Sequence, residues 1–345
     1  MPLEKNKVTI YDVAARAKVA ISTVSRVLNN SADVSDMTRA RVLKAIDELK
    51  YRPDRTAKKL AQQRTPTIAV AVPTYTTPFH NELLKGVRMG LKDREVDLLL
   101  CDLGWRAPVK TLSGFLRRGT VDGLLLAGVQ MDDSVAAELA TLHAPTVIIG
   151  STWDGMEAFD WDDVAGSRAA VEHLVSQGHE RIAMIRSFTD SALQTDRILG
   201  YRQALEAAGI AFDKSLVRSG STRKHEGFSE EAGHEAMQAL LALEERERPT
   251  AVFASSDVQA IGAWSAIVEA GLRVPEDVAV VGYDDLKTSQ YLGLSSVDQS
   301  AQTIGREATD ALIARMEDEV SEDPASRVLT PRLRVRRSSR FVRSA

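Results

Sequence analysis

The pattern of hydrophobic and polar positions divides the chain near residue 65. Before this point, apolar residues recur at helical spacing in three short segments, at residues 10–17, 21–28 and 35–50. After Pro66, short apolar runs alternate with helically spaced segments, which predicts parallel sheets covered by helices on both faces. The expected strands are 68–72, 96–101, 121–126, 146–149, 182–185, 251–254 and 278–281, and the expected helices include 81–91, 166–177, 197–208 and 258–270.

The first two helical segments have the pattern of a helix-turn-helix. Thr9 and Asp12 have the T-x-x-D spacing of a capping box, which marks the start of a helix. Residues 18–20 form the turn, and the apolar positions of the helices face one small shared core. Short hydroxyls can approach phosphates closely, and an arginine can bond O6 and N7 of a guanine together in the major groove. The outward face of the second helix carries groups of both kinds, together with one apolar residue. Its residues are Ile21, Ser22, Thr23, Ser25 and Arg26.

The distribution of charge also points to a polyanion partner. The chain has 345 residues and a net charge of −4, but residues 1–64 carry 14 Lys and Arg against 7 Asp and Glu. Residues 327–345 carry 7 Arg and no acid, which leaves 23 bases against 41 acids, a balance of −18, in the remainder. A basic head on an acidic body favours binding of double-stranded DNA by the head alone.

Several classes of protein are disfavoured by the sequence. The single cysteine, Cys101, excludes an internal disulfide or a multi-cysteine metal site, and its apolar run predicts a buried strand thiol. No apolar stretch is long enough to span a bilayer and the first residues lack the apolar segment of a signal peptide, so we expect a cytoplasmic protein without a membrane partner. The phosphate-binding, zinc-protease and hydrolase motifs are missing, so we expect no enzymatic activity, metal or cofactor.

Four motifs in the first 54 residues resemble the amino-terminal domain of LacI/GalR-family repressors. They are VTIYDVA at 8–14, TVSRVLNN at 23–30, TR-x-x-V at 38–42 and YRPD at 51–54. The chain departs from the family pattern in the turn, where Lys18 replaces the usual Gly or Asn at a position that favours positive φ. Ala20 also replaces the Ser that usually caps the second helix. The resemblance continues through VDGLLL at 121–126, EHLVSQGHERIAMI at 172–185, RILGYRQAL at 197–205 and GLRVPEDVAVVGYDD at 271–285.

The resemblance implies an all-α DNA-binding head followed by an α/β effector domain. That domain is expected to have two doubly wound parallel-sheet subdomains, like periplasmic sugar-binding proteins, with a cleft between them. The chain should cross between the subdomains near residues 161, 291 and 326. The implied divisions are a helix-turn-helix domain at 1–53, a hinge helix and linker at 54–65, and an effector domain at 66–345, with an N-subdomain of about 66–161 plus 292–326 and a C-subdomain of about 162–291 plus 327–345.

The resemblance also implies specific DNA contacts. Arg26, Ile21 and Ser22 are expected to read bases. In the hinge, Leu60 would be wedged into the minor groove with Ala57 beside it, although a solvated linker is the alternative. The remaining expected DNA contacts are Thr9, Tyr11, Thr23, Ser25, Asn29, Thr38 and Tyr51.

Ligands of open parallel sheets bind beyond the carboxyl ends of the strands, so effector contacts are expected in those loops. The resemblance places Arg197 and Asp284 there, where each can bond two vicinal hydroxyls, whereas the plain readings are a surface charge and a turn residue. Arg223 is either a contact for an anionic group or part of a solvated charge run. The other candidates are Tyr75, Phe79, Trp161 and Ser256.

The function that these features favour is a transcriptional repressor. It would bind a palindromic operator as a homodimer under the control of a sugar or sugar phosphate. One alternative is a carbohydrate-metabolising enzyme or a nucleotide-responsive regulator with a DNA-binding head. Another is a solute-binding transport component, which would require export.

Overall fold

The computed structural model describes residues 8–28, 34–49, 65–118, 121–317 and 323–340. The chain divides into two compact units, Met1–Thr65 and Pro66–Ala345, and each is described by itself. Part of the expected DNA interface lies outside the described residues, namely Asn29, Tyr51, Ala57, Leu60 and the hinge helix.

The first unit is a three-helix domain with one small core. Its helices are α1 (Ile10–Ala17), α2 (Ile21–Leu28) and α3 (Asp36–Leu49). Each contributes one fully buried valine, and Val13, Val24 and Val42 pack together with Ala14, Ala17, Val27, Val34 and Ala45. The helices expected from the apolar spacing are therefore confirmed.

Local side-chain chemistry fixes both ends of α1. The Asp12 carboxylate accepts hydrogen bonds from the backbone N–H and the hydroxyl of Thr9, both at 2.7 Å, as the capping pattern predicts. These bonds lower the pKa of Asp12 below its ordinary value. At the other end, Lys18 has a φ of 52° and a ψ of 50°, which is the left-handed conformation expected for the turn.

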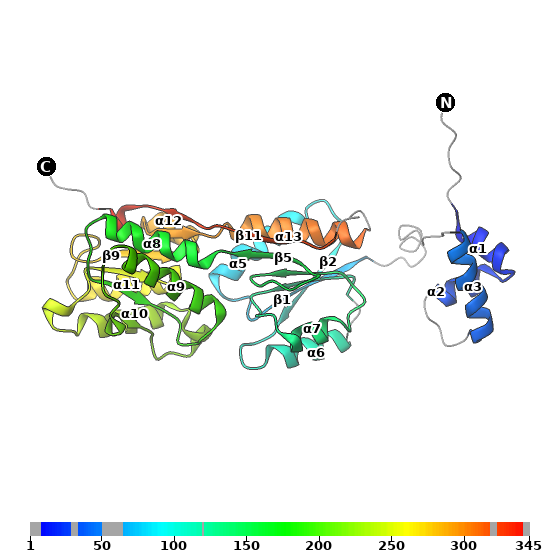
Figure 1. The fold of residues 1–345 in the computed structure, drawn as a ribbon, viewed down its shortest axis with the longest axis horizontal. Helices are drawn as coiled ribbons and strands as arrows, with labels where there is room; N and C mark the ends of the chain where they lie inside the picture. Colours follow the sequence, from blue (N-terminus) through cyan, green and yellow to red (C-terminus); the bar gives the residue numbers. More distant parts are fainter. Residues whose placement is uncertain (1–7, 29–33, 50–64, 119–120, 318–322, 341–345) are drawn as a thin grey trace, which may run out of the picture. The chain divides into compact units, whose positions relative to one another are not determined.

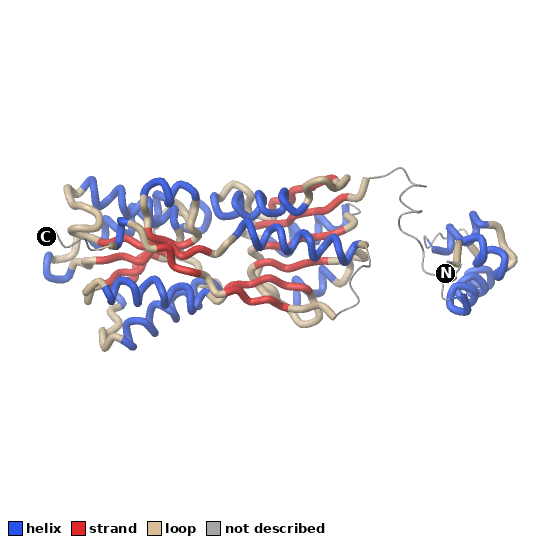
Figure 2. The backbone as a smooth tube through the Cα atoms, turned by 90° about the horizontal axis from the view of Figure 1, so that it is seen from above, coloured by secondary structure: helices blue, strands red, loops and turns tan. Residues whose placement is uncertain are grey.

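The second unit contains two parallel sheets (Figures 1 and 2). We call the part built on each sheet the first and the second lobe. In the first lobe, β1 (Thr67–Val72), β2 (Asp97–Asp102), β3 (Gly123–Ala127), β4 (Thr146–Ile149), β5 (Glu157–Trp161) and β11 (Ser326–Leu329) pair in the order β11-β5-β4-β3-β1-β2. In the second, β6 (Ile182–Ile185), β7 (Val217–Arg218), β8 (Ala251–Ala254), β9 (Ala279–Tyr283), β10 (Ser295–Asp298) and β12 (Arg332–Arg334) pair in the order β12-β10-β9-β8-β6-β7, with β12 antiparallel.

Helices cover both faces of each sheet, which confirms the doubly wound architecture (Figure 1). In the first lobe, α5 (Pro78–Gly90) and α13 (Ala301–Met316) pack on one face, and α6 (Pro108–Arg118) and α7 (Asp133–Leu139) on the other. In the second lobe, α8 (Asp163–Ser176) and α9 (Ala192–Ala207) oppose α10 (Glu230–Leu241) and α11 (Asp257–Glu269). A short helix, α12 (Lys287–Leu292), precedes β10. Within the described part of the chain, no helix combines the length and the apolar character that crossing a bilayer requires.

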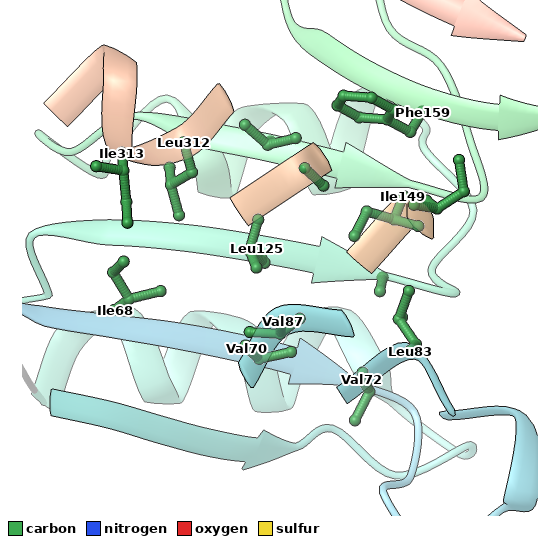
Figure 3. Close-up of a cluster of buried hydrophobic side chains, with 14 of the residues drawn as sticks. Ile68, Val70, Val72, Leu83, Val87, Leu125, Ile149, Phe159, Leu312 and Ile313 are labelled. Carbon is green, nitrogen blue, oxygen red and sulfur yellow. The ribbon is translucent and has the colours of Figure 1, made fainter. Parts of the chain in front are cut away.

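Burial on both faces explains why the central strands are continuous apolar runs. In β1, Ile68, Val70 and Val72 point towards α5 and α13 (Figure 3), whereas Ala69 and Ala71 belong to the core on the opposite face. Side chains alternate between the two faces of a strand, so a strand covered on both sides has no polar positions.

Two of the three expected crossings between lobes lie later in the chain than predicted. The first is between β5 and α8, as expected near residue 161. The second lies between β10 and α13 instead of near residue 291, because β10 pairs with β9 in the second lobe. The third lies between β11 and β12 instead of near residue 326, because β11 pairs with β5 in the first lobe.

The edge strand β2 is apolar but poorly covered. Cys101 is buried, as the sequence predicts. Leu98, Leu99 and Leu100 are nevertheless 40%, 43% and 43% exposed. Consecutive residues point to opposite faces, so apolar side chains are exposed on both sides of this edge.

Glycines permit the closest helix pairs in the second unit. A Cβ atom at Gly262 of α11 would lie 1.9 Å from the backbone oxygen of Glu230 in α10. A Cβ atom at Gly86 of α5 would lie 2.1 Å from the backbone oxygen of Gln302 in α13. Larger residues would force these helices apart.

We predict opposite effects of Gly→Ala at two helical positions. Gly262→Ala should lower the free energy of unfolding by about 1–3 kcal/mol, because the added methyl overlaps a backbone oxygen. Gly114→Ala in α6 is the matched control and should raise it by about 0.5–1 kcal/mol, since no atom of the described residues lies within 4 Å of the new methyl. Urea unfolding of the full chain, followed by circular dichroism, measures both, and equal effects would contradict the close α10–α11 packing.

Candidate functional site

The outward face of α2 has the exposure that a DNA-reading helix needs. Ile21, Ser22 and Arg26 are exposed, with Ile21 at 41%, while Thr23 and Ser25 are half-buried. On the neighbouring elements, Thr9 and Tyr11 are exposed and Thr38 is half-buried. The domain holds this face in place through its valine core and an ion pair between Arg16 of α1 and Glu48 of α3.

The second unit contains a cavity of about 340 Å³ at the carboxyl ends of the strands of both sheets. Five of the seven expected effector contacts line it: Phe79, Trp161, Arg197, Ser256 and Asp284. Each of these residues ends a strand or comes after one, and the strands are different. They lie around one cavity because the carboxyl ends of the strands in both lobes face the same space.

Arg197 is the polar centre of this cavity. Its side chain is almost fully buried, and its Nε donates to Asp163 Oδ1 at 2.9 Å. Nη1 donates to the backbone oxygen of Ser255, and the guanidinium carbon lies 3.7 Å from the centre of the Tyr283 ring. These contacts neutralise the buried charge and fix the direction of the guanidinium. The alternative of a surface charge is therefore wrong.

Gln299 connects Arg197 to the other expected acid. In the amide orientation that satisfies its neighbours, the nitrogen donates to Asp284 Oδ1 at 3.0 Å and the oxygen accepts from Arg197 Nη2 at 3.2 Å. Burial raises the pKa of Asp284 well above its ordinary value, and the nearby Asp257 carboxyl adds to this effect. Asp284 also has a φ of 112°, an uncommon backbone conformation for an aspartate. A sugar hydroxyl entering here would meet both donors and acceptors.

An aromatic wall stands beside this polar centre. The rings of Phe79 and Trp161 meet edge to face with centroids 5.8 Å apart. The indole N–H of Trp161 donates to the backbone oxygen of Gln299 at 2.7 Å. Because this donor is already used, Trp161 presents an apolar surface to the cavity, which suits the apolar face of a pyranose.

His80 lines the same wall as a neutral side chain. Burial and the neighbouring His225 lower the pKa of His80 to about 4. Its Nδ1 lies 2.6 Å from the hydroxyl of Thr77, which also caps α5. His80 therefore adds a hydrogen-bonding group without positive charge at neutral pH.

Two expected effector contacts are not part of the cavity lining. Tyr75 is 44% exposed in the loop after β1. Arg223 is exposed, and its guanidinium carbon lies 4.4 Å from the centre of the Phe188 ring. The structure therefore does not bring Tyr75 and Arg223 together with the other five residues, and their contact with an effector stays a prediction.

Sequence reasoning missed several residues that line the cavity. Three are carboxylates with a raised pKa: burial is the main cause for Asp160, Asp196 and Glu226, and neighbouring carboxylates add to it for Asp160 and Asp196. A tryptophan and an amide, Trp105 and Gln299, were also missed. Their position just after a strand was the available signal for Trp105 and Gln299, whereas Asp160 is the last residue but one of β5. Across the described ranges, no group of three or more His, Cys, Asp or Glu side chains is arranged to hold a metal ion.

Comparison with known proteins agrees with this geometry. Residues 9–54 match the family described as bacterial regulatory proteins, lacI family, and residues 171–339 match the periplasmic binding protein-like domain. The HTH-type transcriptional regulator CelR of Thermobifida fusca is 36% identical over 345 residues, which cover 97% of this chain and 99% of that protein.

Solved structures show the same relationship. The complex of transcriptional regulator CelR with cellobiose is 35% identical, with a TM-score of 0.68 over 96% of this chain and 99% of that chain. The lac repressor dimer bound to operator and the anti-inducer ONPF is 27% identical, with a TM-score of 0.68 over 97% of this chain and 99% of that chain. With a DNA-binding head and an effector domain that match over nearly its full length, the chain belongs to the LacI family of DNA-binding transcriptional regulators, which are not enzymes.

Proposed function

We propose that this regulator is a repressor that binds a palindromic operator as a homodimer and changes its DNA affinity when a sugar enters the cavity. The observation that carries this proposal is the Arg197–Gln299–Asp284 network beside an aromatic wall. Alternating donors and acceptors next to an apolar ring surface suit a polyol with a carbohydrate face. The related CelR structure contains cellobiose, which supports a sugar as the effector.

The proposed DNA contacts follow from the exposed face of the first unit. Arg26, Ile21 and Ser22 read base edges in the major groove, and the hydroxyls around them bind phosphates. The hinge, with Ala57 and Leu60, would add minor-groove contacts. Both residues lie outside the part of the chain that the structure describes. The proposed phosphate contacts are Thr9, Tyr11, Thr23, Ser25, Asn29 and Thr38, and Tyr51 is a further proposed DNA contact.

The proposed dimer interface is the edge of the first sheet. Leu98, Leu99 and Leu100 are exposed on β2, which lies at the edge of the sheet and pairs with β1 on one side, and Met89 on α5 is 53% exposed. Burial of such a patch in a second copy removes apolar surface from water. A twofold dimer would then present two α2 helices to the two half-sites of a palindrome. The related lac repressor structure is a dimer on its operator.

We predict that Arg26→Ala reduces base discrimination. Loss of a bidentate guanine contact should cost about 1–3 kcal/mol of discrimination at one base pair, while most of the salt dependence remains. Binding-site selection followed by titration at several salt concentrations measures both. Arg41→Ala, at an exposed arginine of α3, is the control and should leave base preference unchanged. An unaltered preference for Arg26→Ala would remove Arg26 from base reading.

We predict that Asp284→Gly abolishes the effector response and leaves operator binding intact. Glycine accepts the positive φ at this position, so the variant tests the carboxyl group without backbone strain. Effector affinity should fall at least about tenfold. Gel-shift titration with and without effector measures the response, with Asp154→Gly in an exposed loop as the control. A response at an unchanged effector concentration would exclude Asp284 from the site.

We predict that Leu99→Asp converts the dimer into a monomer. A carboxylate in an apolar interface is desolvated without a partner, which opposes association. Sedimentation analysis measures the mass, and operator affinity should fall with the loss of the second half-site. Val268→Asp, at an exposed apolar residue of α11, is the control and should leave the mass unchanged. A dimeric Leu99→Asp protein would place the interface elsewhere.

A further inference from the structure

The cavity extends across most of the width of both sheets. On the first sheet its lining runs from Trp161 at the end of β5 to Trp105 in the loop after β2. On the second sheet it runs from Gln299 after β10 to Glu226 and Phe228 in the loop after β7. In each sheet the two strands lie four positions apart in the strand order, which corresponds to roughly 19 Å.

Two hydrogen bonds between the lobes show which strand ends face each other. The Trp161 indole donates to the Gln299 backbone oxygen at 2.7 Å, so the end of β5 faces the end of β10. The Thr76 hydroxyl lies 3.2 Å from His225 Nε2, so the loop after β1 faces the loop after β7. The cavity therefore has a near end, with Arg197, Asp284, Gln299 and Trp161, and a far end, with Trp105, Glu226 and Phe228.

The far end has the chemistry of a second sugar subsite. Trp105 and Phe228 both line it and offer aromatic surface. The indole nitrogen of Trp105 is buried and has no hydrogen-bond partner among the residues that the structure describes. A buried donor without a partner is costly, and an acceptor on a ligand removes this cost. The Glu226 side chain provides an acceptor for a ligand hydroxyl.

The charge of the lining selects against anionic ligands. Asp160, Asp163, Asp196, Glu226 and Asp284 all contribute to the lining, whereas its one arginine, among the described residues, is Arg197, which is already paired with Asp163. The pKa of Asp160, of Asp196 and of Glu226 is raised, mainly by burial, so added negative charge is disfavoured here. A phosphate or carboxylate would lose its hydration without gaining a free cation.

We propose that the effector is an uncharged saccharide of at least two rings, with one ring at the near end and the next against Trp105 and Phe228 at the far end. This inference rests on the proposed function, because it assigns the chemical class of the same effector. It excludes the sugar phosphates that the sequence left open.

The test is a binding panel on the full chain. Thermal shift and calorimetry measure the binding of the monosaccharides glucose, galactose, mannose and xylose. The panel also contains disaccharides of these sugars with α-1,4, β-1,3, β-1,4 and 1,6 linkages. The corresponding aldonic acids and 6-phosphates serve as the anionic ligands. We expect one disaccharide to bind at least about tenfold more tightly than its monosaccharide, and its aldonic acid to bind at least about tenfold more weakly. A monosaccharide that binds as tightly as every disaccharide, or an anion that binds best, overturns the inference.

Three variants test the far end with the disaccharide that binds. Trp105→Ala should weaken the disaccharide about tenfold and leave the affinity of the monosaccharide unchanged. Trp105→Phe keeps an aromatic surface without the N–H donor. Its affinity for the disaccharide should lie between that of the unaltered protein and that of Trp105→Ala. Tyr291→Ala removes an aromatic of α12 that is 82% exposed and lies outside the lining, and it is the matched control. Thermal unfolding without ligand verifies that each variant is folded. Equal losses for both ligands, or no loss, overturn the assignment of the far end.

Operator binding separates failure of this inference from failure of the proposed function. If only a monosaccharide binds and it changes operator affinity in a gel shift, the regulator remains sugar-responsive and the two-ring inference is wrong. If no saccharide of the panel binds, both the inference and the proposed effector class are wrong.

Discussion

The structure of the effector domain depends on one buried cation. Arg197 is almost fully buried, and an unpaired guanidinium there would cost several kcal/mol. Its partners come from separate elements: Asp163 begins α8, Ser255 follows β8 and Tyr283 ends β9. Asp163 and Gln299 each lie beside a crossing between the lobes, so the same cation also links two of the crossings. A ligand that bonds Arg197 therefore acts on the part of the chain that sets the positions of the lobes.

The same constraint explains why the cavity is acidic although it contains an arginine. Asp163 already compensates the charge of Arg197, so the other carboxyl groups of the lining have no cation of their own there. Their pKa values rise because burial disfavours the charged form, and the pKa of Asp284 is raised well above its ordinary value. Hydroxyl groups can bond such carboxyls as donors or acceptors, whereas an anion would lose its hydration without gaining a cation that is not already paired. The cavity thus combines strong polarity with selection against negative charge.

Local patterns in the sequence were sufficient for most of the fold. The strands at 146–149, 182–185 and 251–254 have the predicted bounds, because burial on both faces leaves an unbroken apolar run. The polar strand β10, with the sequence SSVD, gave no such signal, so the local pattern could not correct the second crossing that the resemblance implied. The near end of the cavity followed from the resemblance. The far end did not, because only the strand order of the two sheets brings Trp105 and Glu226 to the same cavity, and strand order is not a local property.

Two residues line both the cavity and a groove on the outer surface. Asp257 at the start of α11 accepts the backbone N–H of Leu286 at 2.7 Å and the hydroxyl of Ser296 at 2.6 Å, and burial raises its pKa to about 7. Leu286 lines the cavity and also an outer groove formed by α5 and α12. Pro78 at the start of α5 lines both spaces as well. Because these two residues line both spaces, any movement of them on ligand binding would also change the groove. The free energy available for that change is limited to the difference in ligand affinity between the two positions.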